Sequence, residues 1–177
     1  TGVQTCALPI SCMCWGFEHG DGWFQIIDSL CGQIQNHIDW TRKRRLSTLR
    51  YNRALRQAIR GDDSALVKYF TYGEKPTDWT YEQVDEIMSV PEPEYRIVPQ
   101  ACPQVVASQI KEKFGGLRFY HNGGDDVVDG MIRMAESWAI NTCEECGNIG
   151  KPRHGGWIKT LCNEHAGEKP NVESTNF

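Results

Sequence analysis

The sequence predicts an α+β protein that is mostly helical, with a small sheet and a C-terminal module built on cysteine and histidine. Apolar residues recur at steps of three and four over long stretches, which is typical of amphipathic helices. A few short segments instead combine β-branched and aromatic residues, as strands do. Near the end of the chain, Cys143 and Cys146 are followed after fifteen residues by Cys162 and His165, which indicates a compact module with its own organisation.

The domain organisation expected from this pattern has four parts. Residues 1–10 resemble the in-frame translation of a common sequencing-library adapter, so we expect residues 1–12 to be a non-native leader and Met13 to be the natural start. Residues 13–140 are expected to form a helical α+β domain, and residues 141–168 a module packed on it. The Gly- and Pro-containing end, residues 169–177, is predicted to be a loose tail.

The first half of the chain predicts three helices. Apolar residues such as Trp23 and Ile34 place an amphipathic helix over residues 21–38. A second helix is predicted over residues 41–60, stopped by Gly61. Asp62 or Asp63 could then cap a third helix through residues 65–70.

Between residues 80 and 116, short predicted helices and strands are separated by prolines and glycines. Thr80 with Gln83 fits a capping box for a helix over residues 84–88. The prolines that follow leave room for one short strand at residues 95–98. Residues 103–114 are ambiguous, because Gly115-Gly116 also fits a hairpin; the four-residue spacing of Val106, Ile110 and Phe114 makes us favour a helix there.

The remaining elements lead into the cysteine module. Residues 117–120 alternate as a strand does, and Asn122-Gly123-Gly124 fits a turn. Asp125 or Asp126 is expected to cap a helix through residues 128–138. Residues 157–161 have the apolar and β-branched content of a short strand that delivers the chain to Cys162.

Cys143, Cys146, Cys162 and His165 have the spacing of a structural zinc site in a zinc-ribbon or treble-clef-like module. Each pair places two soft ligands on one tight turn, and Gly147 suits such a turn. Free thiols and disulfides are the alternatives. Four protein ligands would close the site, leaving no position for water or substrate. His154 could replace a ligand, although a loop position suits it better.

Charge is unevenly distributed along the chain. Eight of the nineteen basic residues lie within residues 41–60, which contain no acidic residue, leaving eleven basic against twenty-three acidic residues elsewhere. Such a block can bind an anion or the protein's own acidic surface. No apolar run approaches the length of a membrane span, so no membrane partner is expected.

Several segments together resemble a known group of proteins. They are Gly20-Asp21-Gly22-Trp23, KEKFGGLRFY at residues 111–120, Ala135-Glu136, TCEECG at residues 142–147, and Gly156-Trp157 leading to Thr160-Leu161-Cys162. These segments resemble small uncharacterised proteins of tailed phages and prophages, over the start and the last seventy or so residues. The resemblance implies a phage accessory protein in the cytoplasm of an infected bacterium, and it implies no reaction.

The sequence favours a non-enzymatic binding protein, such as a host-defence antagonist that captures a nucleotide signal or blocks a host protein. Cationic and aromatic side chains offer an anionic small molecule its contacts, since arginine forks suit phosphate and rings stack on bases. The candidates are Arg118, Tyr120, Arg42, Arg45, Arg53 and Arg56.

Two alternatives remain open. A zinc ribbon beside an arginine-rich helix is compatible with nucleic-acid binding, against which stands the acidic total charge. A metal-dependent hydrolase is the second alternative, with Glu18, His19, Asp21, His121, Asp125 and Asp126 as candidate groups. The sequence displays neither a second metal constellation nor a nucleophile turn, so the non-enzymatic interpretation is favoured.

Overall fold

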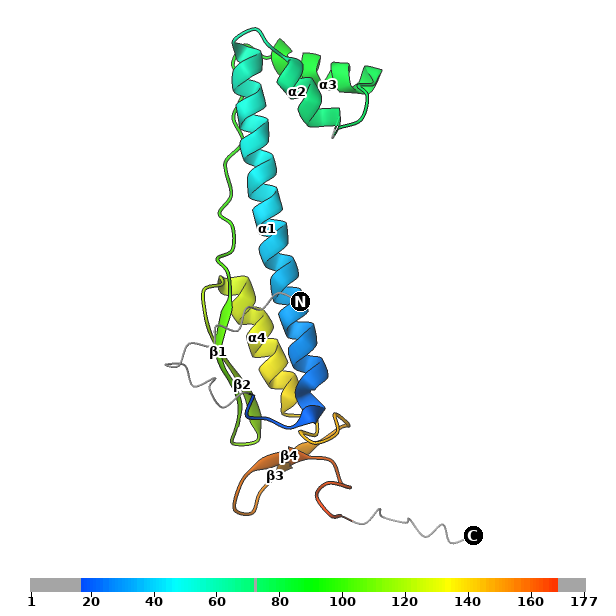
Figure 1. Cartoon of the computed structure of the whole chain (residues 1–177), viewed down its shortest axis with the longest axis vertical. Helices are drawn as coiled ribbons and strands as arrows, with labels where there is room; N and C mark the ends of the chain where they lie inside the picture. The colour runs from blue at the N-terminus through cyan, green and yellow to red at the C-terminus, as the bar shows by residue number, and fades with distance from the viewer. Residues whose placement is uncertain (1–16, 72, 169–177) are drawn as a thin grey trace, which may run out of the picture. The chain divides into compact units, whose positions relative to one another are not determined.

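The computed structural model describes residues 17–71 and 73–168, and the predicted leader and tail lie outside them. The expected fold class is confirmed: helices and two-stranded sheets make an α+β protein (Figure 1). The chain divides into two compact units. Among the described residues, unit 1 combines residues 17–38 with residues 102–168, and unit 2 lies within Asp39–Ala101.

The first helix is longer than predicted. After a short 3-10 turn, η2 (Asp21–Trp23), helix α1 runs from Phe24 to Ile59 without interruption. The prediction of one helix ending at residue 38 and another starting at residue 41 is therefore wrong. No glycine or proline lies between Ile38 and Thr41, and both of these residues are buried, so nothing there ends the helix.

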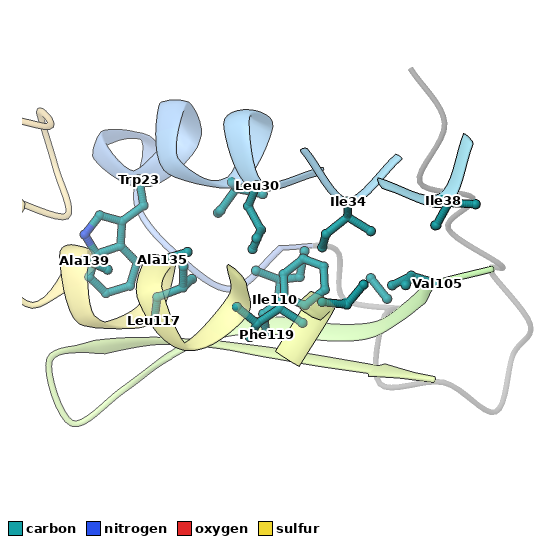
Figure 2. Close-up of a cluster of buried hydrophobic side chains, with 14 of the residues drawn as sticks. Trp23, Leu30, Ile34, Ile38, Val105, Ile110, Leu117, Phe119, Ala135 and Ala139 are labelled. Atoms are coloured by element: carbon teal, nitrogen blue, oxygen red, sulfur yellow. The ribbon is translucent and has the colours of Figure 1, made fainter. Parts of the chain in front are cut away.

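Unit 1 is built on a β-hairpin covered by helices. Strands β1 (Val106–Lys113) and β2 (Gly116–Asn122) pair antiparallel, and helix α4 (Asp126–Ala139) packs with the first part of α1 over the sheet (Figures 1 and 2). The core between these elements is apolar throughout. Its central members are Trp23, Leu30, Ile34, Ile38, Val105, Ile110, Leu117, Phe119, Ala135 and Ala139.

The helix favoured for residues 103–114 is wrong, because this segment forms strand β1 of a hairpin. The register shifts between Ala107 and Gln109, which leaves Ser108 as an extra residue in the strand. This bulge lets Ala107 and Ile110, three positions apart, both face the core. The four-residue spacing that favoured a helix does not follow the buried positions, because Ile110 is buried whereas Phe114 is 75% exposed in the turn of the hairpin.

Three other predictions in unit 1 are confirmed. The strand at residues 117–120 lies within β2. The N-cap of α4 is Asp125, whose carboxylate accepts the Val128 N–H at 3.2 Å. The predicted strand at residues 157–161 is β4 (Lys159–Leu161), which pairs antiparallel with β3 (Lys151–Arg153).

Unit 2 packs the rest of α1 against helices α2 (Ser64–Thr71) and α3 (Asp78–Ser89). Of the two predicted caps of α2, Asp63 directly precedes the helix, and its carbonyl accepts the Leu66 and Val67 N–H groups. The Asp62 carboxylate accepts hydrogen bonds from the backbone and hydroxyl of Ser64. The N-cap of α3 is Thr77, three residues before the predicted cap Thr80, which is instead the partner of Thr77 in the capping box. The small core consists of Tyr51, Ala54, Leu55, Ala58, Leu66 and Val84.

The strand predicted at residues 95–98 is absent from unit 2, where this stretch is extended but unpaired with another strand. Its backbone bonds to a side chain instead. Asn52 donates to the Arg96 carbonyl at 2.8 Å and accepts the Arg96 N–H at 2.9 Å. The Arg96 guanidinium lies 3.6 Å above the Tyr51 ring, which adds a cation–π contact.

A candidate metal centre in unit 1

The structure brings the four predicted ligands together. One donor atom from each of Cys143, Cys146, Cys162 and His165 lies within 4.8 Å of the other three. Cys146 Sγ and Cys162 Sγ are 3.8 Å apart, and Cys143 Sγ is 3.6 Å from His165 Nδ1. Tetrahedral zinc with ordinary bond lengths puts two sulfurs about 3.8 Å apart and a sulfur and a nitrogen about 3.6 Å apart. Cys162 Sγ is closer to His165 Nδ1, at 3.2 Å, and the four donors together could hold one metal ion.

Local backbone geometry forms the two ligand turns. In the first, Gly147 donates its N–H to the Cys143 carbonyl at 2.9 Å, with a φ of 76° that a side chain would disfavour. In the second, Ala166 donates to the Cys162 carbonyl at 3.0 Å, and the His165 N–H points at the Cys162 sulfur at 3.5 Å. Both turns are closed by their own hydrogen bonds.

The electrostatics of the quartet favour the thiolate at Cys143 and Cys162, whereas the pKa of the Cys146 thiol is raised. Burial raises the pKa of the Cys143 thiol, but backbone N–H groups of the ligand turns outweigh it and lower this pKa to about 6. The His165 N–H lowers the pKa of Cys162, and the neighbouring Cys162 and Cys143 side chains raise the pKa of His165. Thiolates are the form of cysteine that binds metal ions. Sulfur and imidazole donors of this kind favour a soft or borderline cation.

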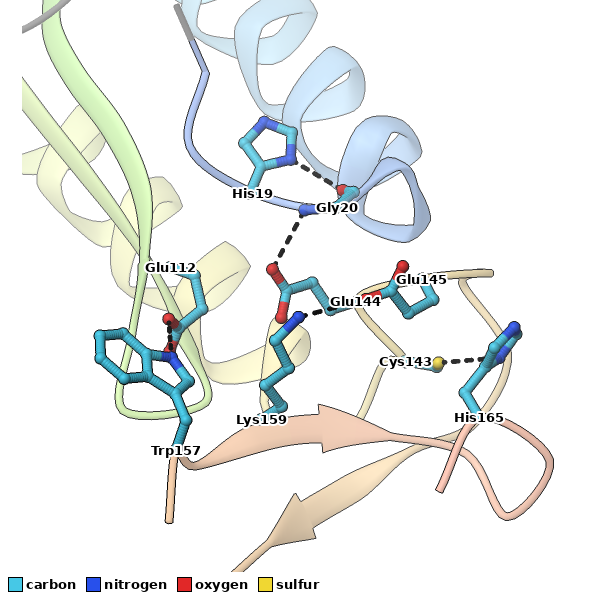
Figure 3. A network of polar contacts seen from close by, with 9 residues as sticks. All are labelled: His19, Gly20, Glu112, Cys143, Glu144, Glu145, Trp157, Lys159 and His165. Carbon is cyan, nitrogen blue, oxygen red and sulfur yellow. Dashed lines mark hydrogen bonds and ion pairs between the residues drawn. The ribbon is translucent and has the colours of Figure 1, made fainter. Parts of the chain in front are cut away.

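The Gly20-Asp21-Gly22-Trp23 segment holds the first ligand turn from outside. Gly22 donates its N–H to the Glu144 carbonyl at 2.7 Å, and Gly20 donates to the Glu144 carboxylate at 3.1 Å (Figure 3). Trp23, completely buried, donates its indole N–H to the Thr142 carbonyl at 2.8 Å. The cysteine module is therefore bonded directly to the start of α1.

Glu144 is a buried acidic residue beside the quartet that the sequence does not single out. Its side chain is buried, and Oε2 is a buried atom without a hydrogen-bond partner among the described residues. Burial raises the pKa of this carboxyl group. Lys159, which donates to Glu145 at 3.3 Å, lies close by (Figure 3). No motif in the sequence distinguishes Glu144 from its exposed neighbour Glu145.

The hairpin turn of unit 1 contacts the module from the other side. The Thr160 hydroxyl on β4 donates to the Gly115 carbonyl at 2.6 Å. Glu112 accepts the Gly115 N–H with one oxygen and the Trp157 indole N–H with the other (Figure 3). Glu112, Gly115, Trp157 and Thr160, which make these contacts, all belong to segments that the sequence analysis singled out.

The candidate anion-binding residues are divided between the two units. Arg118 lies on β2, where it donates to the Leu117 carbonyl and is 3.8 Å from Glu136. Tyr120, also on β2, has Lys111 over its ring at 5.7 Å. The other four candidates belong to unit 2 and are exposed on α1: Arg42, Arg45, Arg53 and Arg56. Arg45 donates to the Pro99 carbonyl.

A groove lies beside the first ligand turn, between α1 and α4, with a volume of about 850 Å³. Its floor is apolar and includes Ile26, Leu30 and Met131. Met134 and Trp138, each 64% exposed, form the α4 side. Among the described residues that line this α1–α4 groove there are two carboxylates, Asp21 and Glu145, and no arginine or lysine.

A scan against protein-family models and searches of curated proteins and of solved structures find no match to this chain. Within residues 17–71 and 73–168, no helix combines the length and apolar character needed to cross a membrane.

Proposed function

We propose that this chain is a non-enzymatic phage accessory protein that acts in the cytoplasm of an infected bacterium by binding a host protein. The observation that carries the proposal is the α1–α4 groove. Exposed apolar patches next to polar rims mark protein-binding sites in soluble proteins. The resemblance of several segments, including residues 111–120 and 142–147, to phage and prophage proteins supports the biological setting.

The metal of the quartet is proposed to be zinc with a structural role. Three sulfurs and one imidazole nitrogen are a common zinc donor set, and they select against magnesium and calcium, which prefer oxygen. Four protein ligands complete a tetrahedron. The metal would then hold the turn that forms one end of the groove, where Cys146 and Gly147 line it.

The lining of the groove favours a protein segment over a nucleotide. A nucleotide phosphate needs cationic or N–H donors, whereas the described lining carries carboxylates and no arginine or lysine. Methionine side chains such as Met131 and Met134 adapt to apolar partners and recur where amphipathic helices bind in grooves. The carboxylates of Asp21 and Glu145 favour a partner helix with basic residues beside its apolar face.

A selection experiment tests this proposal. A displayed library of amphipathic helical peptides is selected on the purified protein, and the affinity of the recovered peptide is measured by calorimetry. We expect a basic amphipathic helix whose affinity falls at least about tenfold in Trp138→Ala, as at a binding hot spot. Val127→Ala, an exposed residue of α4 that does not line the groove, is the matched control.

Two results would argue against the groove. One is a selected peptide that binds Trp138→Ala as tightly as the wild type. The other is a nucleotide that binds in the same calorimeter and whose affinity depends on Arg118, which would support the nucleotide-capture interpretation instead.

Nucleic-acid binding is a second candidate function, supported by unit 2. All eight basic residues within residues 41–60 are exposed, and Arg42, Arg45, Arg53, Arg56 and Arg60 recur along one side of α1. Such a stripe can neutralise backbone phosphates. If it does, the affinity for DNA or RNA should fall steeply as the salt concentration rises. The double variant Arg53→Ala/Arg56→Ala should show a weaker salt dependence. Absence of binding at low salt would exclude this function.

A further inference from the structure

A second group of metal-type ligands lies in unit 1, apart from the quartet. It consists of His37 on α1, Cys102 just before β1, and Asp125 at the N-terminus of α4, with one donor atom of each within 4.8 Å of the other two. These residues are far apart in the sequence, so no spacing pattern marks them as a second metal constellation. The fold alone brings them together.

The contacts of Asp125 determine what the trio can do. His37 Nε2 lies 3.1 and 2.9 Å from the two carboxylate oxygens, and the Val128 N–H orients the same carboxylate. Burial raises the pKa of Asp125, but hydrogen bonds from His37, Val128 and Cys102 outweigh it and lower the pKa overall. Both the imidazole and the thiol therefore point at the carboxylate.

These contacts differ from those of a cysteine nucleophile activated by histidine, and the Cys102 thiol also donates to the Pro103 carbonyl at 3.4 Å. Such a site needs the imidazole between the thiol and the carboxylate, so that the nitrogen takes the thiol proton. Here the carboxylate occupies the middle position. The same convergence suits a cation, because a thiolate sulfur, an imidazole lone pair and a carboxylate oxygen can all be directed at one point.

We propose that His37, Cys102 and Asp125 form a second metal site, for a borderline divalent cation of the Zn²⁺ or Co²⁺ class. Nitrogen, sulfur and oxygen donors together select this class over magnesium and calcium. On binding, the Cys102 thiol releases its proton to solvent and the sulfur bonds to the metal.

The site differs from the quartet in having three protein ligands. A three-ligand site leaves one coordination position for water or an exchangeable group. Cys102 is buried, while the Asp125 side chain is 36% exposed, so solvent reaches the site from the carboxylate side. The second ion is therefore expected to bind more weakly and to exchange faster than the ion in the quartet.

Cobalt titration of the metal-free full-length protein tests the proposal, with bound equivalents counted from the visible bands and from native mass spectrometry. We expect two equivalents in the wild type. Cys102→Ser should weaken the second equivalent by at least about 100-fold and Asp125→Asn by at least about tenfold, since even indirect partners of a metal contribute such factors. Loss of Cys102 should also remove the sulfur-to-cobalt charge-transfer band of that equivalent.

Two variants separate a metal role from a structural one. Asp125→Asn keeps an oxygen that can cap α4, so its helix signal and melting curve should match the wild type even though its second equivalent is weakened. Cys31→Ser removes a cysteine on α1 that belongs to neither group of ligands, and this variant should still bind two equivalents of cobalt. The cysteines before residue 17 are present in every variant, so they cancel in the comparison.

The proposal is overturned if the wild type binds a single equivalent, or if both Cys102→Ser and Asp125→Asn retain two equivalents at wild-type affinity. Should Cys102→Ser fail to fold, Asp125→Asn decides alone.

Discussion

Gly22 donates its backbone N–H to the carbonyl oxygen of Glu144 at 2.7 Å, which bonds the start of α1 to the first ligand turn. The approach is so close that a Cβ on Gly22 would lie 2.1 Å from the Cys143 carbonyl oxygen and 2.5 Å from the Gly147 nitrogen. Only glycine fits there. The entry segment and the quartet are therefore parts of one structure, although they lie far apart in the chain.

Gly22→Ala is expected to destabilise the protein by about 2 kcal/mol or more, because the added methyl group collides with backbone that the metal ligands hold in place. Urea unfolding measures the change. Gly32→Ala is the control: a Cβ added to Gly32 on α1 would have no neighbour within 4 Å, and alanine should stabilise this helix by up to about 1 kcal/mol. Equal stability of wild type and Gly22→Ala would refute the close packing.

Cys143→Ser and His165→Ala are each expected to abolish metal binding by the quartet and to unfold the C-terminal third of the chain. Binding of structural zinc contributes directly to the free energy of folding, so the loss of one ligand removes both the metal and this contribution to stability. Native mass spectrometry and thermal unfolding measure the two effects. His154→Ala, which removes an exposed histidine outside the quartet, should leave both unchanged. A quartet variant that keeps its metal and its melting curve would contradict the assignment.

Phe114→Asn is expected to stabilise the hairpin by about 1 kcal/mol. Phe114 has a φ of 55° and is followed by Gly115 with a φ of 75°, the backbone that an Asn-Gly turn prefers. A left-handed conformation costs an ordinary residue roughly 1–2 kcal/mol. Phe114→Ala removes the same exposed ring without relieving this strain, so the gain should be specific to asparagine. If alanine stabilises as much, the ring and not the backbone is responsible.

Asn52→Ala is expected to release the extended stretch of unit 2 around Arg96. The variant loses both hydrogen bonds that the Asn52 amide makes to the Arg96 backbone, each contributing about 1 kcal/mol. Hydrogen exchange at the Arg96 amide should accelerate at least about fivefold. Gln57→Ala, at an exposed position of α1, serves as the control, and unchanged exchange in Asn52→Ala would show that the Tyr51 contact suffices.

Local sequence patterns were sufficient to predict an element where the residues that start and end it lie next to it in the sequence. Asp125 follows two glycines and precedes an amphipathic stretch, so the cap and α4 could be predicted together. The bulge at Ser108 and the side-chain pairing of Asn52 with Arg96 depend on residues distant in the chain. Periodicity within one segment carries no information about them, which explains the errors at β1 and at residues 95–98.

The same distinction applies to the sites. The quartet could be predicted because its ligands lie in two close pairs within one short stretch. The α1–α4 groove and the trio of His37, Cys102 and Asp125 depend on how α1 and α4 pack, and Glu144 is recognisable only by its burial. Sites assembled from separate elements leave no spacing in the sequence.

The central claim is that a metal in the quartet holds the first ligand turn against the start of α1. Hydrogen exchange at the Gly22 amide tests it most directly, in zinc-loaded wild type, His165→Ala and Asp125→Asn. The account predicts slow exchange in the wild type and in Asp125→Asn, and fast exchange in His165→Ala. Equal protection of Gly22 in His165→Ala and the wild type would contradict it.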